Sequence, residues 1–331
     1  MSRVGIIANP ASGKDIRRLV AYASLMDNRD KTDLVKRIVL GIDSTGVDEI
    51  LIMPDYYGLG SAALSGMRRE DIKTRISILD MKVTGTQEDS TNAMRMMREI
   101  GAECVVTVGG DGTNRAVAKG DRSIPLVTVS TGTNNVFPVM VEATTAGIAA
   151  GVVTRGVVDL KDVVTTHKRL VVVMNGSDYD MALVDAVVME QPFIGARAVW
   201  KISEVQQIIC TRAEPDSIGL SSIGGCVCPV RPEDDYGLCL MLGEGNIRVR
   251  AAVLPGVIQE IGIRDFKRIK LGEEVEVVPG PCLIALDGER ELTVRATDEA
   301  RVRLERDGPN VIDINKAIRK AAVNGFFTNH K

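Results

Sequence analysis

The sequence predicts an α/β protein, with a doubly wound, Rossmann-like parallel sheet in the N-terminal part and a mostly antiparallel β domain after it. Two observations carry this prediction. Up to about residue 155, short apolar runs alternate with amphipathic segments, which is typical of β-α-β units. Beyond that point, apolar runs follow one another at hairpin distances and are joined by Gly, Pro and Asp turns. At 331 residues the chain exceeds the usual size of one core, so two domains are expected.

The N-terminal part alternates between strand and helix patterns. The predicted strands are Val4–Ala8, Ile50–Met53, Ile76–Leu79, Cys104–Val108 and Leu126–Val129. The predicted helices, whose apolar residues recur at helical spacing, are Ile16–Met26, Leu34–Leu40, Leu59–Met67, Ser90–Ile100 and Asn114–Ala118. The helix at Glu88 has the clearest ends, because Thr86 or Gln87 can open it and Gly101 can stop it. This order predicts a helix-covered parallel sheet with a nucleotide site at its carboxyl edge.

A helix rich in small residues is predicted over Val136–Val153, and the first domain is expected to end just after it, at residue 155. Residues 156–310 are expected to form a β-rich substrate domain. Its predicted strands are Val157–Val164, Leu170–Met174, Ala182–Met189, Gly237–Leu242, Ile247–Val253, Val275–Val278, Cys282–Leu286, Leu292–Ala296 and Val302–Leu304. Ala196–Ile209 has helical spacing instead. Residues 311–331 hold a last helix, Val311–Val323, which we expect to pack back on the first domain.

Composition argues against several classes of partner. The net charge is −3 and the basic residues are scattered, so no nucleic-acid partner is expected. No apolar run approaches the roughly 20 residues of a membrane span, and no leader pattern precedes Val4, so we expect a cytoplasmic protein. The expected assembly is a homo-oligomer.

Cysteine and histidine usage does not predict a metal centre. The six cysteines have no Cys-x-x-Cys spacing, and Cys226 and Cys228 are interpreted as small buried side chains on a strand. The only histidines are His167 and His330, which argues against histidine-based catalysis. His167 is expected at a strand edge on the surface, because charged neighbours follow it.

The most informative feature is an apolar run that ends in the loop Gly109-Gly-Asp-Gly-Thr113. Backbone N–H groups in such a loop, together with the start of the next helix, can bind a phosphate closely. The residues expected to do so are Gly109, Gly110, Gly112 and Thr113. Taken alone, the glycines could form only a tight turn, and Asp111 could be a turn former. In phosphoryl transfer, however, a carboxylate at this place can act as a base or organise a metal.

This loop resembles the signature of the superfamily that contains NAD kinases, diacylglycerol and sphingosine kinases, and phosphofructokinases. Three further segments match in the same order: Asn9-Pro-Ala-Ser-Gly-Lys-Asp15, Ser130-Thr-Gly-Thr-Asn-Asn-Val-Phe137 and Asp287-Gly-Glu289. The chain is similar to the ATP-NAD kinase-like group that includes the acetoin-catabolism protein X family, and Ser217–Gly225 is similar to part of an NAD-kinase segment. The resemblance implies a NAD kinase/diacylglycerol kinase-like fold, with ATP or another nucleoside triphosphate as donor and Mg²⁺ as cofactor.

The resemblance also implies site residues outside the glycine loop. Further contacts to the nucleotide are expected from Asn9, Ser12, Gly13, Thr131, Gly132, Thr133 and Asn135. Ser12 could equally cap a helix that begins at Asp15. Asp287-Gly288-Glu289 could be a simple hairpin turn. It could also face the cleft between the domains, with Glu289 assisting Asp111, Asp287 holding Mg²⁺, and Asp287 and Gly288 contacting the substrate.

The identity of the phosphoryl acceptor is implied by the resemblance alone. NAD is the leading candidate, but Val184 and Asp185 stand where NAD kinases have Asn-Glu, and a valine side chain makes no hydrogen bond. Asp185 is expected to contact the substrate. Val136 stands at the position where the lipid kinases have an aspartate. We expect an NAD-kinase-like phosphotransferase that moves the γ-phosphate of a nucleoside triphosphate to a hydroxyl group. A kinase for another small hydroxylated metabolite or a lipid, and a non-catalytic nucleotide-binding regulator, are the alternatives.

Overall fold

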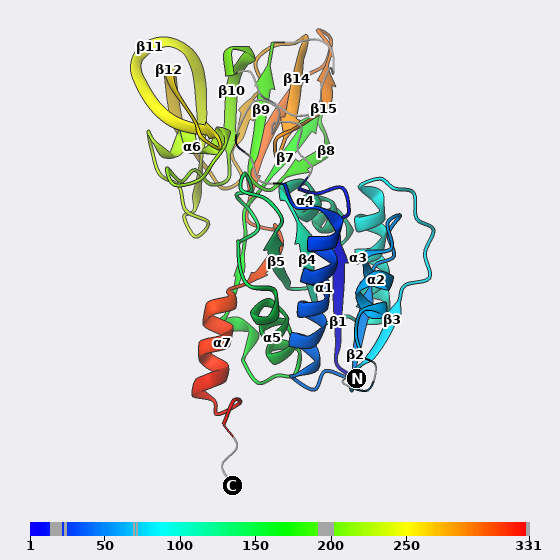
Figure 1. Ribbon diagram of the computed structural model, residues 1–331. Coiled ribbons are helices and arrows are strands. Elements are labelled where there is room, and N and C mark those ends of the chain that lie inside the picture. Colours follow the sequence, from blue (N-terminus) through cyan, green and yellow to red (C-terminus); the bar gives the residue numbers. More distant parts are fainter. Residues whose placement is uncertain (14–21, 23–24, 69, 71, 191–201, 329–331) are drawn as a thin grey trace.

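The computed structural model describes residues 1–13, 22, 25–68, 70, 72–190 and 202–328. Figure 1 shows two stacked parts: a sheet covered by helices, which we call the α/β part, and a group of antiparallel sheets, which we call the β part. The predicted fold class is confirmed. Within the described residues, no helix is both long and apolar enough to cross a membrane.

The α/β part is built on a seven-stranded sheet in the order β3-β2-β1-β4-β5-β17-β6. Its strands are β1 (Arg3–Ala8), β2 (Glu49–Ile52), β3 (Arg75–Ile78), β4 (Cys104–Gly109), β5 (Leu126–Ser130), β6 (Val164–Thr166) and β17 (Asn310–Ile312). Strands β1 to β5 pair in parallel, as predicted, and β17 continues the parallel order beside β5. The carboxyl ends of the first five strands therefore meet at one edge.

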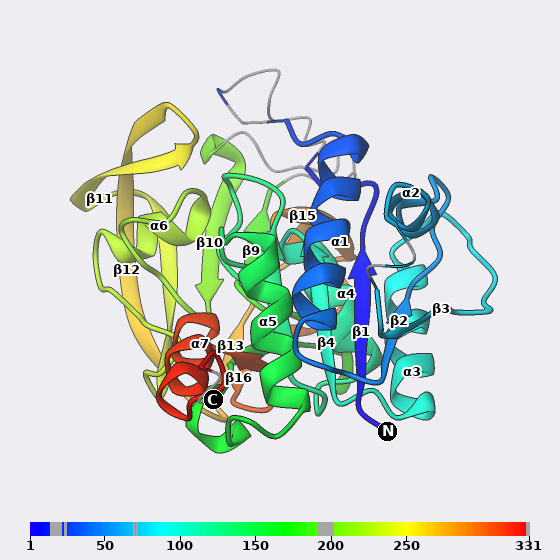
Figure 2. The same cartoon turned by 60° about the horizontal axis from the view of Figure 1, so that its bottom comes forward.

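Helices cover both faces of this sheet. They are α1 (Asn28–Asp43), α2 (Leu59–Ser65), α3 (Glu88–Ile100), α4 (Asp111–Gly120), α5 (Ala143–Thr154) and α7 (Ile314–Val323). Neighbouring strand residues face opposite cores: Ile6 packs with α1 and α5, whereas Ile7 packs with α3 and α4. Figure 2 shows α1 and α5 side by side on one face, with α7 against α5. A sheet buried on both faces explains the nearly continuous apolar strands.

The β part contains two antiparallel sheets. The larger sheet has the order β12-β11-β10-β9-β14-β15, and the smaller one β13-β16-β7-β8. Their strands are β7 (Arg169–Met174), β8 (Ser177–Ala182), β9 (Asp185–Met189), β10 (Val205–Cys210), β11 (Tyr236–Leu254), β12 (Val257–Lys270), β13 (Glu274–Glu276), β14 (Cys282–Leu286), β15 (Glu289–Val294) and β16 (Ala300–Glu305). Helix α6 (Leu220–Gly225) packs on the larger sheet. Alternate residues of β9 enter different cores, because Val188 lies between the two sheets and Val187 lies on the α6 side.

Several predicted helices and strands are wrong in detail. The helix predicted from Val136 begins only at Ala143, because residues 136–142 run irregularly past the sheet edge, where Val139 forms a bridge with Val129. Of the helix predicted over 196–209, residues 196–201 lie outside the described residues and 205–209 form strand β10. The apolar run there is a buried central strand, which periodicity alone does not distinguish from a helix. Most of Ile16–Met26 lies outside the described residues.

Other differences concern the β-rich region. The run Val157–Val164 ends in a 3-10 helix, Leu160–Asp162, and leads into β6, which joins the parallel sheet. The two runs predicted between residues 237 and 253 form the single strand β11, which pairs with β12 on both sides of an irregularity between Leu242 and Ile247. Cys226 is exposed in a turn rather than buried on a strand. The domain limits at 155 and 310 stay a prediction.

Candidate functional site

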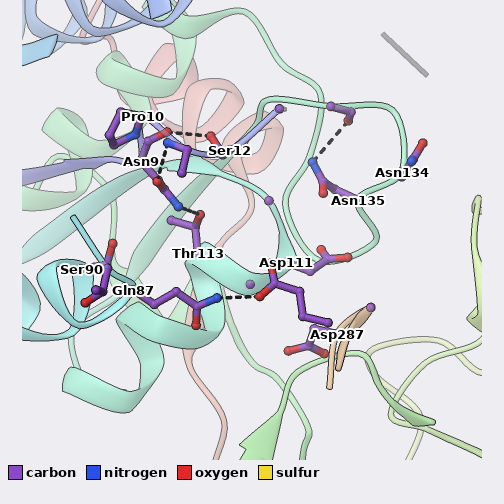
Figure 3. A pocket seen from close by; sticks show the side chains of 18 of the residues that line it. Asn9, Pro10, Ser12, Gln87, Ser90, Asp111, Thr113, Asn134, Asn135 and Asp287 are labelled. Carbon is purple, nitrogen blue, oxygen red and sulfur yellow. Dashed lines mark hydrogen bonds between the residues drawn. The ribbon is translucent and has the colours of Figure 1, made fainter. Parts of the chain in front are cut away.

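A cavity of about 1050 Å³ lies at the carboxyl edge of the parallel sheet, where the α/β part meets the β part. Loops after β1, β2, β3, β4 and β5 line it from one side, and the turn between β14 and β15 lines it from the other. Among the predicted site residues, those that line the cavity are Asn9, Ser12, Gly13, Gly110, Asp111, Gly112, Thr113, Gly132, Thr133, Asn135, Asp185, Asp287, Gly288 and Glu289. Figure 3 shows how several of these converge from different elements.

Two predicted site residues, Gly109 and Thr131, do not line the cavity. Gly109 ends β4, where a Cβ atom would lie 2.5 Å from the side chain of Thr113, so this glycine permits close packing beneath the loop. Thr131 is buried, and its Oγ1 has no hydrogen-bond partner among the described residues. Both residues shape the loops behind the wall of the cavity.

The glycine loop leads directly into α4. Gly110 is the N-cap in an extended conformation, and among the described residues no side chain caps the helix. The first turn therefore presents backbone N–H groups toward the cavity, an arrangement that suits a phosphate. A Cβ atom at Gly110 would lie 2.7 Å from Asn135 Oδ1, and one at Gly112 would lie 3.4 Å from Glu289 Oε1. Side chains from the α/β part and from the β part therefore both lie close to the backbone of the glycine loop.

The loop after β1 is tied to the glycine loop. Asn9 Nδ2 donates to Thr113 Oγ1 at 2.8 Å, and Asn9 Oδ1 accepts from the N–H of Ala11 at 2.9 Å (Figure 3). Ser12 Oγ donates to the carbonyl of Asn9 at 2.8 Å. Whether Ser12 caps a helix at Asp15 lies outside the described residues. Gly13 has φ of +67°, and a Cβ atom there would lie 2.9 Å from the carbonyl of Thr131, so the position requires glycine.

A buried lysine beneath this loop was not predicted. Lys31 on α1 is fully buried, and its Nζ donates to the carbonyl oxygens of Pro10 at 2.7 Å and Ser12 at 2.5 Å. The sequence did carry a signal. Lys31 precedes Leu34 and Val35 by three and four residues, so it lies on the buried stripe of α1, where an unpaired charge would be costly.

Asp111 occupies the first turn of α4 and faces the loop after β5. Its Oδ1 accepts from the N–H of Phe137 at 2.8 Å, and both of its oxygens lie 3.1 Å from the N–H of Val136. Burial, followed by repulsion from the nearby carboxylate of Asp287, raises the pKa of Asp111 to about 7. Figure 3 shows both carboxylates at the same end of the cavity. A carboxylate with such a pKa can accept a proton near neutral pH.

Asp287 is buried at the β14–β15 turn with φ of +50°. Its carboxylate accepts from the N–H groups of Leu183, Val184 and Asp185 at 3.0, 2.8 and 3.3 Å. The guanidinium of Arg115 on α4 lies 3.7 Å away, and both side chains are fully buried. Burial raises the pKa of Asp287, and Arg115 opposes that shift. The turn is therefore both a hairpin turn and a wall of the cavity, and Asp287 anchors it.

Glu289 joins the two parts of the molecule. Its Oε2 accepts from Nε2 of Gln87, the N-cap residue of α3, at 2.7 Å (Figure 3). Its other oxygen faces Gly112 of the glycine loop. The contact with Gln87 was not predicted, because nothing in the sequence pairs the start of α3 with a turn about 200 residues later.

Other lining residues were also missed. The loops after β2 and β3 contribute the exposed Tyr56 and Tyr57 and the segment from Thr84 to Ser90. Their place was available from the sequence, because each follows a strand at the same sheet edge. The wall formed by residues 218–221 falls in the segment that resembles NAD kinases.

Val184 cannot make the side-chain hydrogen bonds that an asparagine at this position would offer. It is buried with Phe137 and Leu183 and does not line the cavity. Its backbone N–H is already donated to Asp287. Asp185, next to it, does line the cavity.

The residues present suit Mg²⁺ only in combination with a nucleotide. The part of the chain that the structure describes contains no group of three or more His, Cys, Asp or Glu side chains arranged to hold a metal. Mg²⁺ commonly takes one or two carboxylates and completes its coordination with substrate phosphates and water. Asp111, Asp287 and Glu289 line the cavity and offer such carboxylates, and oxygens of both Asp111 and Asp287 also accept from backbone N–H groups.

Known proteins resemble the chain along its whole length. Residues 4–157 match the ATP-NAD kinase N-terminal domain, and residues 168–307 match the acetoin catabolism protein X C-terminal domain. The acetoin catabolism protein X of Cupriavidus necator is 36% identical over 329 residues, covering 96% of this chain and 92% of that protein.

Solved structures share the architecture at low sequence identity. Yeast NADH kinase complexed with NADH has a TM-score of 0.55 at 14% identity, covering 100% of this chain and 89% of that one. A putative diacylglycerol kinase from Bacillus anthracis str. Sterne has a TM-score of 0.45 at 14% identity, covering 94% and 97%. The likeness to the yeast enzyme identifies the fold as that of the NAD-kinase-like proteins.

Proposed function

Because the chain belongs to the acetoin catabolism protein X family, we propose that it is an NAD-kinase-like phosphotransferase that moves the γ-phosphate of ATP, or of another nucleoside triphosphate, to a hydroxyl group. One observation carries the proposal. The phosphate-binding start of α4 and the carboxylates of Asp111 and Glu289 line a single cavity, although they come from both parts of the molecule. A protein that only binds nucleotide needs the glycine loop but not these carboxylates.

The arrangement assigns a role to each group. N–H groups of the glycine loop hold the donor phosphates, and Asn9 keeps that loop fixed to the loop after β1. Asp111, with its pKa of about 7, takes the proton of the acceptor hydroxyl while the hydroxyl oxygen forms its bond to the γ-phosphorus and the nucleoside diphosphate leaves. When bound, Mg²⁺ would offset phosphate charge, held by Asp287 or Glu289 together with the nucleotide.

NAD is the leading candidate for the acceptor, and Asp185 and Gly288 are the residues proposed to contact it. The cavity of about 1050 Å³ lies at the upper end of the range of small-molecule and cofactor sites. The buried Val184 supplies no polar side-chain contact, so NAD is expected to bind more weakly than it would to a site with asparagine there. Another small hydroxylated metabolite or a lipid alcohol is the alternative acceptor.

An acceptor screen tests the proposal. Purified protein is incubated with γ-labelled ATP and Mg²⁺ against NAD, NADH, sugars, small diols and lipid alcohols. We expect label in at least one acceptor, and a loss of about 10²- to 10⁴-fold in rate for Asp111→Asn, because a positioned base is removed. ATP affinity should change little, because backbone groups hold the phosphates. Turnover of the variant within about threefold of the parent, or no labelled acceptor at all, would contradict the proposal.

A further inference from the structure

Arg212 reaches from the β part to the loop that holds Asp111. It follows β10 and is only 6% exposed. Its Nη1 donates to the carbonyl of Val136 at 3.2 Å, and its guanidinium lies 5.0 Å from the centre of the Phe137 ring. Val136 and Phe137 are the two residues whose N–H groups bind Asp111. The dipeptide Val136–Phe137 therefore has two partners. Its N–H groups donate to Asp111, whereas the carbonyl of Val136 and the ring of Phe137 contact Arg212.

His167 fixes the other side of this guanidinium. Arg212 Nη2 contacts His167 Nδ1, and the His167 ring packs edge-on against Phe137 at 5.2 Å. His167 lies between β6 and β7, where the chain passes from the parallel sheet to the β part. The prediction that it is a surface residue is wrong: it is buried. Burial, followed by the charge of Arg212, lowers the pKa of His167 well below its ordinary value, so a neutral ring accepts from the guanidinium.

A second arginine makes the reciprocal contact. Arg115 of α4, in the α/β part, lies against Asp287 of the β part, whereas Arg212 of the β part lies against the loop that binds Asp111. An arginine from the other part of the molecule thus supports Asp287 directly and Asp111 through the Val136–Phe137 loop. The buried Arg115–Asp287 pair is costly to break, because removal of one partner leaves the other charge buried.

We propose that Arg212 is a positioning residue for Asp111: by holding the Val136–Phe137 backbone from the β part, it sets the orientation of the proposed base. The inference rests on the proposed phosphotransferase function for its kinetic consequences. Its structural content, that the hydrogen bonds of Val136 and Phe137 to Asp111 depend on Arg212, does not depend on any reaction.

The charged groups around Asp111, Arg212 and His167 show which electrostatic interactions a substitution of Arg212 would change. Asp111 faces Arg212 and the carboxylate of Asp287. The acidic groups that face Arg212 are Asp111, Glu214, Glu233 and Asp287. The cationic side chains near His167 are Arg212, Arg306 and Lys168. Removal of Arg212 takes a positive charge from the neighbourhood of Asp111 and leaves repulsion from Asp287 unopposed on that side.

The test compares Arg212→Met, Arg212→Lys and the surface control Arg248→Met, which changes an exposed ion pair with Glu260. With the acceptor from the screen, Arg212→Met should lower kcat by about 10- to 100-fold, with less than about threefold change in the KM for ATP. Arg212→Lys restores the charge but not both contacts, so its kcat should be intermediate between those of the parent and Arg212→Met. Arg248→Met should match the parent.

Hydrogen exchange of the backbone amides gives a readout that needs no activity. In Arg212→Met, the N–H groups of Val136 and Phe137 should exchange at least about tenfold faster, whereas amides of the β11–β12 hairpin should not change. Faster exchange without any labelled acceptor would sink the proposed function and keep the structural inference. Unchanged exchange in a folded Arg212→Met or Arg212→Lys variant, or an unchanged kcat in Arg212→Met, would overturn the role of Arg212.

Discussion

At the scale of single residues, the state of Asp111 decides what this site can do. An ordinary aspartate is fully ionised at neutral pH and is a weak base, whereas this one has a pKa of about 7. The cause is local. Burial in the cavity wall and the neighbouring Asp287 oppose the charge more strongly than two backbone N–H donors and Arg212 favour it.

The same shift predicts a pH-dependent stability. The folded protein keeps a proton on Asp111 that the unfolded chain releases near pH 4, so this contribution is complete below pH 4 and is lost as pH rises through about 7. Asp111→Asn cannot ionise, and it should be more stable than the parent at pH 8 by about 1–3 kcal/mol, with no gain at pH 4. Urea denaturation at both pH values measures this difference.

The matched control for that measurement is Asp265→Asn, which changes an exposed aspartate on β12 far from the cavity. It should show the same stability relative to the parent at both pH values. An Asp111→Asn variant that is less stable than the parent at pH 8 would contradict the raised pKa.

At the scale of elements, the site is a set of loops at strand ends that are locked to one another. The glycine loop contacts the loop after β1 through Asn9, the loop after β5 through Asn135, and the β14–β15 turn through Glu289. The phosphate site is therefore formed by several strand ends and not by one motif.

Gly110→Val tests the glycine loop. The new side chain would push against Asn135 and close the space above the first turn of α4, so the affinity for ATP–Mg²⁺ should fall by roughly 10- to 100-fold as charged hydrogen bonds are lost. Ala62→Val is the control, because it adds the same side chain at an exposed position of α2 that does not line the cavity. Titration calorimetry on folded protein measures both. Equal affinity of the Val variant and the parent would remove this loop from the donor site.

Lys31→Met tests the support beneath the loop after β1. Loss of the ammonium leaves the carbonyls of Pro10 and Ser12 without this donor, so the free energy of unfolding should fall by about 1–3 kcal/mol and ATP–Mg²⁺ binding should weaken. Lys36→Met on the same helix removes only a partly exposed ion pair with Asp33, and it should cost less than about 1 kcal/mol. Thermal and urea denaturation compare the two variants. An equal cost for both would show that Lys31 does not support the loop.

At the scale of the whole molecule, the two parts meet through buried charge as well as through apolar packing. Asp287 binds Arg115 across this boundary and also fixes the backbone of residues 183–185. Removal of one partner of such a pair leaves the other charge buried.

Asp287→Ala should therefore reduce the free energy of unfolding by about 3–5 kcal/mol. Asp307→Ala is the comparison, because Asp307 forms a half-exposed pair with Arg169, and its loss should cost about 1 kcal/mol or less. Chemical denaturation provides both values. If the two variants lose similar stability, the Asp287–Arg115 contact does not join the two parts as described here.

Much of the fold followed from the sequence, because its signals are local. Alternating apolar runs and amphipathic segments identified β1 to β5 and α3, including the stop at Gly101, which adopts the left-handed conformation that favours glycine. The spacing of apolar residues predicted the wrong element where tertiary contacts outweigh the local sequence pattern. The run 205–209 has helical spacing but is a central strand. Residues 136–142 are not helical, because Val139 forms a bridge with β5 and the N–H of Val136 donates to Asp111.

The sequence by itself determined the motifs: the glycine loop, Asp111 and the Asp287-Gly-Glu289 turn were named as site residues from their composition and order. Only the tertiary structure decided which of their atoms face the cavity. Asp287 is tied to the backbone of residues 183–185, Glu289 reaches Gln87, and Arg212 and His167 are buried behind Asp111. The physical reason is that hydrogen bonding and desolvation depend on neighbours that are far apart along the chain and are brought together only when the two parts pack.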